Sequence, residues 1–246
     1  REVNRCNSNI DFGMGVRVIS GDQTGYAYVE EITLNEMLRA ARTAARIASG
    51  TRKANPVALT EKSIKTNFYT VSTPWDNLLL KDKMPYLQRL NDRIFDADKR
   101  VQKVSASLTD DTSHILFCNS EGVTFYDYRP MATLSAVCIM EENGKIENNY
   151  ASRAYRKGAD FLTNDLVDIV AREAVENTAK LFQAVKPKGG GMPVVMGAGG
   201  SGILLHEAIG HAFEADFNRK NISIFSDQLH KKICNENISV VDDGTV

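Results

Sequence analysis

The sequence lacks a long apolar run, an excess of one charge and more than a few cysteines. Its 246 residues include 30 Lys and Arg against 31 Asp and Glu, so no overall positive field exists to hold a phosphate backbone or an anionic membrane. No apolar stretch approaches the roughly 18–20 residues of a membrane span, and the first ten residues have no signal-peptide core. These absences argue against direct nucleic-acid binding and membrane insertion, and predict a cytoplasmic protein.

Cysteine is too sparse to build a disulfide framework. The four cysteines are Cys6, Cys118, Cys138 and Cys234. Cys118 and Cys138 lie in the apolar runs HILFC and SAVCIM, which predicts reduced, partly buried thiols. With 43% hydrophobic and 25% charged residues, the chain has the composition of a globular protein, and it is long enough to fold without such staples.

Alternating and helical periodicity predict the elements of the first hundred residues. Residues 16–19 and 26–29 alternate around a glycine-containing turn, which is typical of a hairpin. Thr33 and Glu36 have capping-box spacing at the start of a helix that ends before Gly50. Residues 51–85 contain three prolines and predict a loop with one strand, and a second helix is expected over about 85–101.

The second half predicts an antiparallel meander, a long helix and a domain boundary. Strand-like runs follow one another up to Tyr155, separated by TDDT, NSEG and ENGK, and a third helix is expected over 165–185. The segment KPKGGG then combines proline, glycine and charge. The fold class is therefore α+β. We predict an N-terminal α/β domain over 1–188, with the meander and three helices, and the start of a C-terminal domain over 189–246.

After this boundary come a short predicted strand, PVVM, a glycine-rich turn, GAGGSG, and an apolar helix that carries the motif H-E-x-x-x-H. The motif residues are His206, Glu207 and His211. In the familiar zinc motif the two histidines are four residues apart and reach one ion. A separation of five would turn them by roughly 140° on a regular helix, so the pair can share an ion only if the turn widens to i→i+5. Gly210 is where the backbone deforms most easily.

If the turn widens, His206 and His211 are candidate Zn²⁺ ligands and Glu207 is the candidate catalytic base that activates water against a carbonyl. The alternative is that all three are partly buried and meet ordinary hydrogen-bond needs, although burying three ionisable groups without a ligand is costly. A catalytic zinc also needs a third protein ligand. Spacing does not single one out among the nearby side chains of Glu214, Asp216, His230 and Cys234.

Two other classes of function remain open. The glycines Gly197, Gly199 and Gly202 fit a dinucleotide-binding turn, although the acidic residue Asp227 lies further along than that turn requires and no repeated βαβ pattern precedes it. A non-catalytic module could instead capture peptides by adding a strand to an edge of the meander.

The stretches PVVMGAGGSGILLHEAIGHAFEADF, FNRKNISIFSDQL and SVVDDGTV resemble the TldD subgroup of the TldD/PmbA metalloprotease family, with weaker support from NIDFGMGVRVISGDQTGYAYVEEIT. The resemblance implies a zinc-dependent peptidase acting on short or unfolded peptides, with metal at His206 and His211 and catalysis at Glu207. It also implies a β-rich C-terminal domain that supplies a cysteine as third ligand from outside this sequence.

The same resemblance implies a dimer, formed either with an identical chain or with a paralogue that lacks the motif and the metal. The family label "modulator of DNA gyrase" then reflects an indirect link rather than DNA binding. Family chains are nearly twice as long. This agrees with the start at Arg1 and the stop at Val246, just after a strand-and-turn pattern, which together predict an incomplete chain.

Overall fold

The computed structural model describes residues 5–49, 57–62 and 71–242. Two compact units divide the chain. The first comprises residues 1–63 and 116–125, and the second comprises residues 64–115 and 126–246. Within the described residues, no helix is long and apolar enough to cross a membrane.

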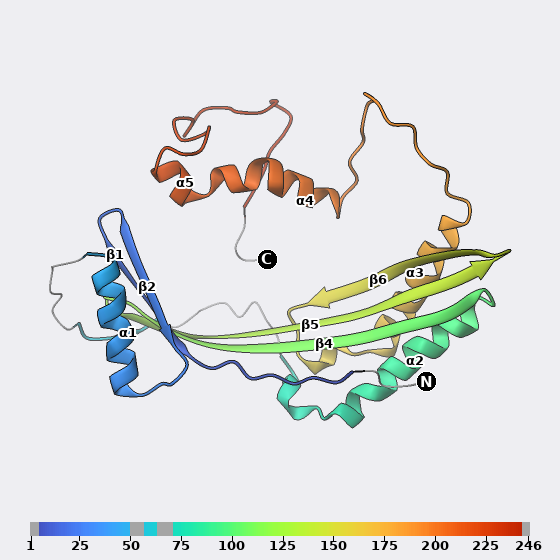
Figure 1. Ribbon diagram of the computed structural model, residues 1–246, viewed down its shortest axis with the longest axis horizontal. Helices are drawn as coiled ribbons and strands as arrows, with labels where there is room; N and C mark the ends of the chain where they lie inside the picture. The colour runs from blue at the N-terminus through green and yellow to red at the C-terminus, as the bar shows by residue number, and fades with distance from the viewer. Residues whose placement is uncertain (1–4, 50–56, 63–70, 243–246) are drawn as a thin grey trace. The chain divides into compact units, whose positions relative to one another are not determined.

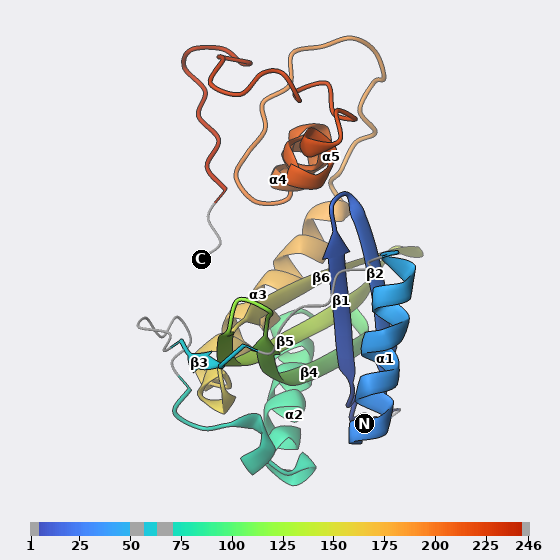
Figure 2. The ribbon, with the colours of Figure 1, turned by 90° about the vertical axis from the view of Figure 1, so that its left-hand side faces the viewer.

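A hairpin packed on one helix forms most of the first unit. Strands β1 (Met14–Ser20) and β2 (Gln23–Val29) pair antiparallel, and helix α1 (Leu34–Ile47) lies along them (Figures 1 and 2). The predicted hairpin and helix are confirmed, and Thr33 caps α1 by accepting a hydrogen bond from the Glu36 backbone N–H. A Cβ at Gly25 would lie 1.9 Å from the Ala44 carbonyl oxygen, so only glycine allows β2 to approach α1 this closely.

Strand β3 (Thr60–Glu61) completes the first unit by pairing in parallel with residues Val123 and Thr124. It is the strand expected within residues 51–85. The rest of that prediction falls partly on residues 51–56 and 63–70, which lie outside the described residues.

Three long strands, apart from their residues between 116 and 125, form the sheet of the second unit. These are β4 (Val101–Cys118), β5 (Val123–Glu142) and β6 (Lys145–Tyr155), with β5 between the other two. β5 and β6 are antiparallel, with Ala132 opposite Tyr155 and Glu142 opposite Lys145. The meander is confirmed, but its division into shorter runs is wrong.

One predicted interruption lies inside a strand, and a proline lies inside another. TDDT was expected to be a turn, yet Asp110 lies within β4, where its carboxylate is 2.6 Å from Nζ of Lys83. That partner, 27 residues away, stabilises an acidic residue in the strand. Pro130 lies in β5 between the stretch that pairs with β3 and the stretch that pairs with β6. Between these two stretches, no described strand pairs with the edge of β5 that faces β3 and β6. The backbone N–H that proline lacks therefore has no strand partner to lose there, and its absence costs little stability.

Helices α2 (Leu80–Ala97) and α3 (Asn164–Leu181) pack against each other, and α3 also packs on β6 (Figure 1). α2 starts before the predicted position because the Asp82 side chain accepts a hydrogen bond from the Leu79 N–H. It ends at Ala97, so the residues predicted to complete it lead into β4 instead. α3 ends four residues before the predicted end at 185.

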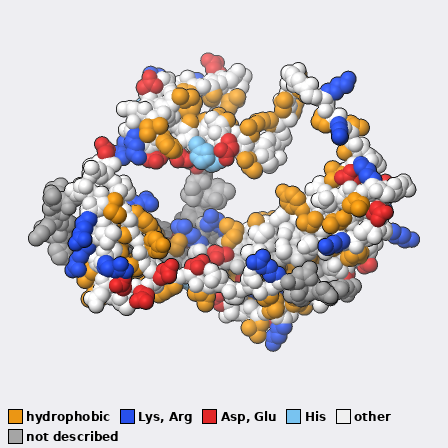
Figure 3. All heavy atoms as spheres, in the orientation of Figure 1, with side chains coloured by type: hydrophobic (Ala, Val, Ile, Leu, Met, Phe, Trp, Pro, Cys, Tyr) orange, Lys and Arg blue, Asp and Glu red, His pale blue; other side chains and the backbone are white. Residues whose placement is uncertain are grey.

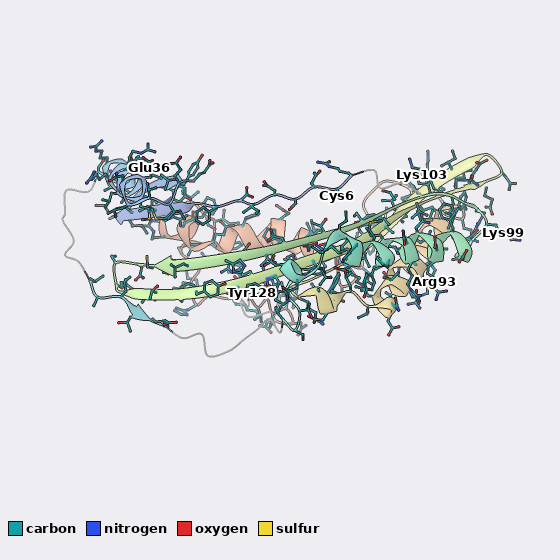
Figure 4. All side chains as sticks on the ribbon, turned by 90° about the horizontal axis from the view of Figure 1, so that it is seen from below. Cys6, Glu36, Arg93, Lys99, Lys103 and Tyr128 are labelled. Carbon is teal, nitrogen blue, oxygen red and sulfur yellow. The ribbon has the colours of Figure 1, made fainter. Side chains whose placement is uncertain are left out.

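The hydrophobic core lies between these helices and the sheet. Its fully buried side chains include Leu90, Ile94, Leu134, Met140, Val167 and Val170. At about 1.5–3 kcal/mol for each large apolar side chain, this burial is the main favourable contribution to folding of the second unit. Charged side chains also join the two helices. Arg93 lies on the side of α2 next to α3 (Figure 4), and both it and Arg89 form ion pairs with Asp168 of α3.

All four cysteines are free, as expected. Cys138 is buried in the core, and desolvation raises the pKa of its thiol. Cys118 is exposed, so its predicted burial is wrong. It is the last residue of β4, and the apolar run around it does not continue into the core.

The segment after α3 contains short helical turns and differs most from the prediction. They are α4 (Ser201–Leu205), η3 (His206–Gly210), η4 (His211–Phe213) and α5 (Ala215–Arg219). The predicted strand at residues 193–196 is absent from this described part, where Val194 is 76% exposed and Val195 97% exposed. A strand needs a hydrogen-bonded neighbour, and none of the described residues supplies one. The expected strand before the final turn is likewise absent from the described residues up to 242.

Candidate metal centre

The structure brings His206, Glu207 and His211 together. One potential ligand atom from each residue lies within 4.8 Å of the other two. The two imidazole rings have centroids 4.4 Å apart and planes inclined at 64°. Figure 3 shows the histidine surface on the α4–α5 segment, with acidic side chains beside it. The predicted metal-site residues therefore share one side of the helical segment.

A π turn produces this arrangement. η3 is a π helix, in which the backbone N–H of His211 donates to the carbonyl oxygen of His206 five residues earlier. This is the widened turn that the five-residue spacing requires, and it returns the second histidine to the side of the first. Gly210 contributes directly, because a Cβ at this position would lie only 3.1 Å from Nδ1 of His206. The expected deformation next to Gly210 is confirmed.

Two carboxylates face the two nitrogens of His211. Oε2 of Glu207 lies 3.7 Å from Nε2, and Oε1 of Glu214 lies 2.6 Å from Nδ1. The hydrogen bond with Glu214 is the largest cause of a raised His211 pKa, and the negative charges of Glu214 and Glu207 act in the same direction against partial desolvation. The imidazole therefore has one nitrogen engaged by a carboxylate and the other facing Glu207.

All three motif side chains are exposed, with 51% exposure for His211 and 61% for Glu207. The alternative in which all three groups are partly buried is therefore wrong for the described chain, because the segment from α4 to α5 contains no buried residue. The cost of burying charge is therefore no argument for a site here. The argument for a candidate site is that the π turn brings the three side chains together.

The other candidate ligands do not join the cluster. Among the described residues, the close group contains none of Glu214, Asp216, His230 and Cys234. Glu214 engages Nδ1 of His211, and the Cys234 thiol lies 3.6 Å from the carbonyl oxygen of Ile238. Sequence reasoning considered Glu214 as a ligand or as a surface or capping residue, and missed its pairing with His211. The three-residue spacing that places side chains side by side on a helical turn was the available signal.

The glycine-rich turn does not have the surroundings of a dinucleotide site. No strand lies directly before Gly197, since the described residues 182–196 contain none, and the helix that follows it has five residues. A Cβ at Gly197 or Gly202 would meet nothing within 4 Å, so close packing does not require glycine at either position. The strand, turn and helix layout of a dinucleotide fold is therefore missing from this part of the chain.

Three domain models of one protein family match the sequence. Residues 1–48 match the PmbA/TldA metallopeptidase domain 1, residues 73–182 match the central domain, and residues 189–246 match the C-terminal domain. The three domains follow one another along this chain in the order first, central and C-terminal.

Curated relatives and solved structures agree with these matches. The sequence is 35% identical to a metalloprotease TldD homolog of Haemophilus influenzae, covering 97% of this chain and 51% of that protein. It is 34% identical to a metalloprotease TldD homolog of Buchnera aphidicola, covering 99% of this chain and 52% of that protein. The chain thus spans about half the length of these curated relatives.

The fold is similar to two crystal structures, each named a modulator of DNA gyrase. The one from Thermotoga maritima has a TM-score of 0.54 at 15% identity, covering 72% of this chain and 39% of that chain. The one from Bacteroides thetaiotaomicron has a TM-score of 0.53 at 14% identity, covering 68% and 39%. At these identities the similarity concerns the fold alone.

Proposed function

Because the chain belongs to the TldD/PmbA metalloprotease family, we propose that it carries the HExxxH part of a zinc-dependent peptidase site that hydrolyses short or unfolded peptides. The relatives' names support a metallopeptidase. The observation that carries the finer proposal is the π turn that brings His206, Glu207 and His211 to one side of the segment.

The donor set fits a divalent metal ion such as Zn²⁺. Imidazole and carboxylate groups are typical zinc ligands. One potential ligand atom from each of the three side chains lies within 4.8 Å of the other two. Zinc ligand bonds of about 2.0–2.2 Å require the atoms to close in slightly, which exposed side chains do by rotation. We propose His206 and His211 as the metal ligands. The third ligand stays a prediction from family resemblance, a cysteine outside this sequence.

A bound Zn²⁺ would supply Lewis acidity, which polarises a peptide carbonyl and makes water a stronger acid. The chain's own contribution to the chemistry is Glu207. Its carboxylate lies 3.7 Å from Nε2 of His211, beside the nitrogen proposed to face the metal. From there it would accept the proton of the attacking water and pass it to the leaving amine.

The substrate and the partner of the whole protein are also matters of proposal. We propose a peptide substrate, and a dimer formed with an identical chain or with a metal-free paralogue. The division into domains at residues 188 and 189 and the cytoplasmic location stay predictions from the sequence.

The test uses the complete protein with its metal. Glu207→Gln should abolish cleavage of an unfolded peptide while the zinc content measured by atomic emission stays stoichiometric, because the residue moves a proton and is not a ligand. His206→Ala should lose both the zinc and the activity. Full activity in Glu207→Gln would contradict the proposed mechanism.

The same assay separates the rival functions. A peptide-binding module predicts that the wild type binds a peptide without cleaving it, and that Glu207→Gln binds equally well. A dinucleotide-binding protein predicts tight NAD(H) binding in a metal-free sample.

A further inference from the structure

The carboxylate of Glu214 turns back toward the π turn instead of capping the helix that it precedes. Glu214 occupies the position before the first residue of α5, yet its side chain makes no capping hydrogen bond there. Its Oε1 atom lies 2.6 Å from Nδ1 of His211. The side chain is therefore hydrogen-bonded to the second histidine of the motif.

This contact determines which nitrogen of His211 is free. A carboxylate accepts a hydrogen bond, so in the neutral imidazole, the form that binds a metal, the Nδ1 atom beside it carries the proton and Nε2 keeps its lone pair. Nε2 is also the atom that lies 3.7 Å from Glu207. An imidazole whose Nδ1–H is held by a carboxylate is a better metal ligand, because its tautomer and orientation are fixed before the ion binds.

We propose that Glu214 is a positioning residue that holds His211 with Nε2 directed toward Glu207 and His206. The inference rests on the proposed function and extends it by one residue. Glu214 is not itself a ligand in this proposal. Its carboxylate lies on the Nδ1 side of the ring, and the close group of ligand atoms comprises His206, Glu207 and His211 without it.

The backbone that places Glu214 does not depend on its side chain. The Asn218 side-chain amide donates to the carbonyl oxygens of Ala212 at 2.8 Å and of Glu214 at 3.0 Å. The Ser223 hydroxyl also donates to the Ala212 carbonyl oxygen, at 2.6 Å. These bonds hold the turn between His211 and α5, so a change of the Glu214 side chain should leave the turn in place and remove only the contact with His211.

The experiment measures metal affinity in the complete protein by competition between the apoprotein and a chromogenic chelator for Zn²⁺. Glu214→Ala should weaken Zn²⁺ binding by about 10–100-fold, the usual effect of losing such a partner. Glu214→Gln keeps an oxygen that accepts the Nδ1–H bond and should lose clearly less. Glu236→Ala, which removes an exposed carboxylate elsewhere in this segment, should bind Zn²⁺ like the wild type.

Cobalt substitution separates a positioning residue from a ligand. At saturating Co²⁺, Glu214→Ala should keep the position and intensity of the wild-type visible absorption bands, because the set of coordinating atoms is unchanged. Loss of that spectrum would make Glu214 a ligand and overturn the inference. Unchanged Zn²⁺ affinity in Glu214→Ala would also overturn it while leaving the proposed function intact. If His206→Ala bound Zn²⁺ as tightly as the wild type does, the proposed function would be overturned, and the inference with it.

Discussion

The backbone of Gly210 lies directly against the imidazole of His206, where an added Cβ would be 3.1 Å from Nδ1. We predict that Gly210→Ala displaces this ring by a few tenths of an ångström and lowers the Zn²⁺ affinity of the complete protein by about tenfold, the lower end of the range for disturbed support of a ligand. Chelator competition measures the change.

Gly202→Ala is the matched control. Gly202 lies in α4 of the same segment, and a Cβ there would meet nothing within 4 Å. Alanine is also the better helix former, so the variant should fold and bind Zn²⁺ as the wild type does. Equal losses in the two variants would mean that any added side chain disturbs the segment, and the specific contact between Gly210 and His206 would not be the cause.

The ion pairs that join α2 to α3 should make stability depend on pH. Nη2 of Arg89 lies 2.7 Å from Oδ2 of Asp168, and Nε of Arg93 lies 3.0 Å from Oδ1. The hydrogen bond from Arg89 is the main cause of a lowered Asp168 pKa. A lowered folded-state pKa stabilises the protein above the unfolded-state value of about 3.9, and this contribution disappears as the pH falls through the folded-state pKa.

We therefore predict that Asp168→Asn lowers the free energy of unfolding at pH 7 by no more than about 1 kcal/mol, because the pair is partly exposed. The difference from wild type should shrink at the lowest pH at which the wild type still folds. Urea unfolding at both pH values measures it. Glu176→Gln, which alters an exposed carboxylate of the same helix, serves as control. A difference that stays constant down to that pH would show that the ion pairs are not its source.

Two leucines of α2 should contribute differently to the free energy of unfolding, because they differ in burial. Leu90 is fully buried, whereas Leu80, in the first turn, is 50% exposed. Leu90→Ala should lower the free energy of unfolding by about 2–5 kcal/mol, because it removes apolar contacts and leaves a cavity. Leu80→Ala should cost less than about 1 kcal/mol. Urea denaturation measures both changes, and similar values would contradict the position of the core between the helices and the sheet.

Local sequence signals predicted the elements whose determinants lie within a few residues. The Thr33 cap, the glycine turn after β1 and the π turn beside Gly210 are of this kind. The structure departs from prediction where a distant partner decides the outcome. Asp110 lies in a strand, where the distant residue Lys83 pairs with it. The apolar residues at 193–196 form no strand, because a strand also needs a neighbour.

The candidate site shows the same division. The motif and its spacing identified His206, Glu207 and His211, and the need for a common ion predicted the widened turn. The three-residue spacing of His211 and Glu214 was only a partial signal for their contact, because the contact also depends on the break in the helix between Phe213 and Ala215. The exposure of the segment was also unpredictable from its apolar composition, since composition does not say what covers a helix.

Metal binding should protect this exposed segment from proteolysis. An ion held by the proposed ligands His206 and His211 would tie together the two ends of the π turn and would have to dissociate before the segment opens. For an ion that binds only the closed form, the population of the open form falls by a factor of 1 + [Zn²⁺]/Kd. At a concentration 100 times Kd, cleavage within residues 201–219 of the complete protein should therefore slow by about 100-fold, provided that opening is fast relative to cleavage.

Glu207→Gln should keep this protection because it keeps both proposed ligands, and His206→Ala should lose it. Mass spectrometry of the fragments locates the cuts, and equal protection of His206→Ala would mean that zinc acts elsewhere on the protein or on the protease.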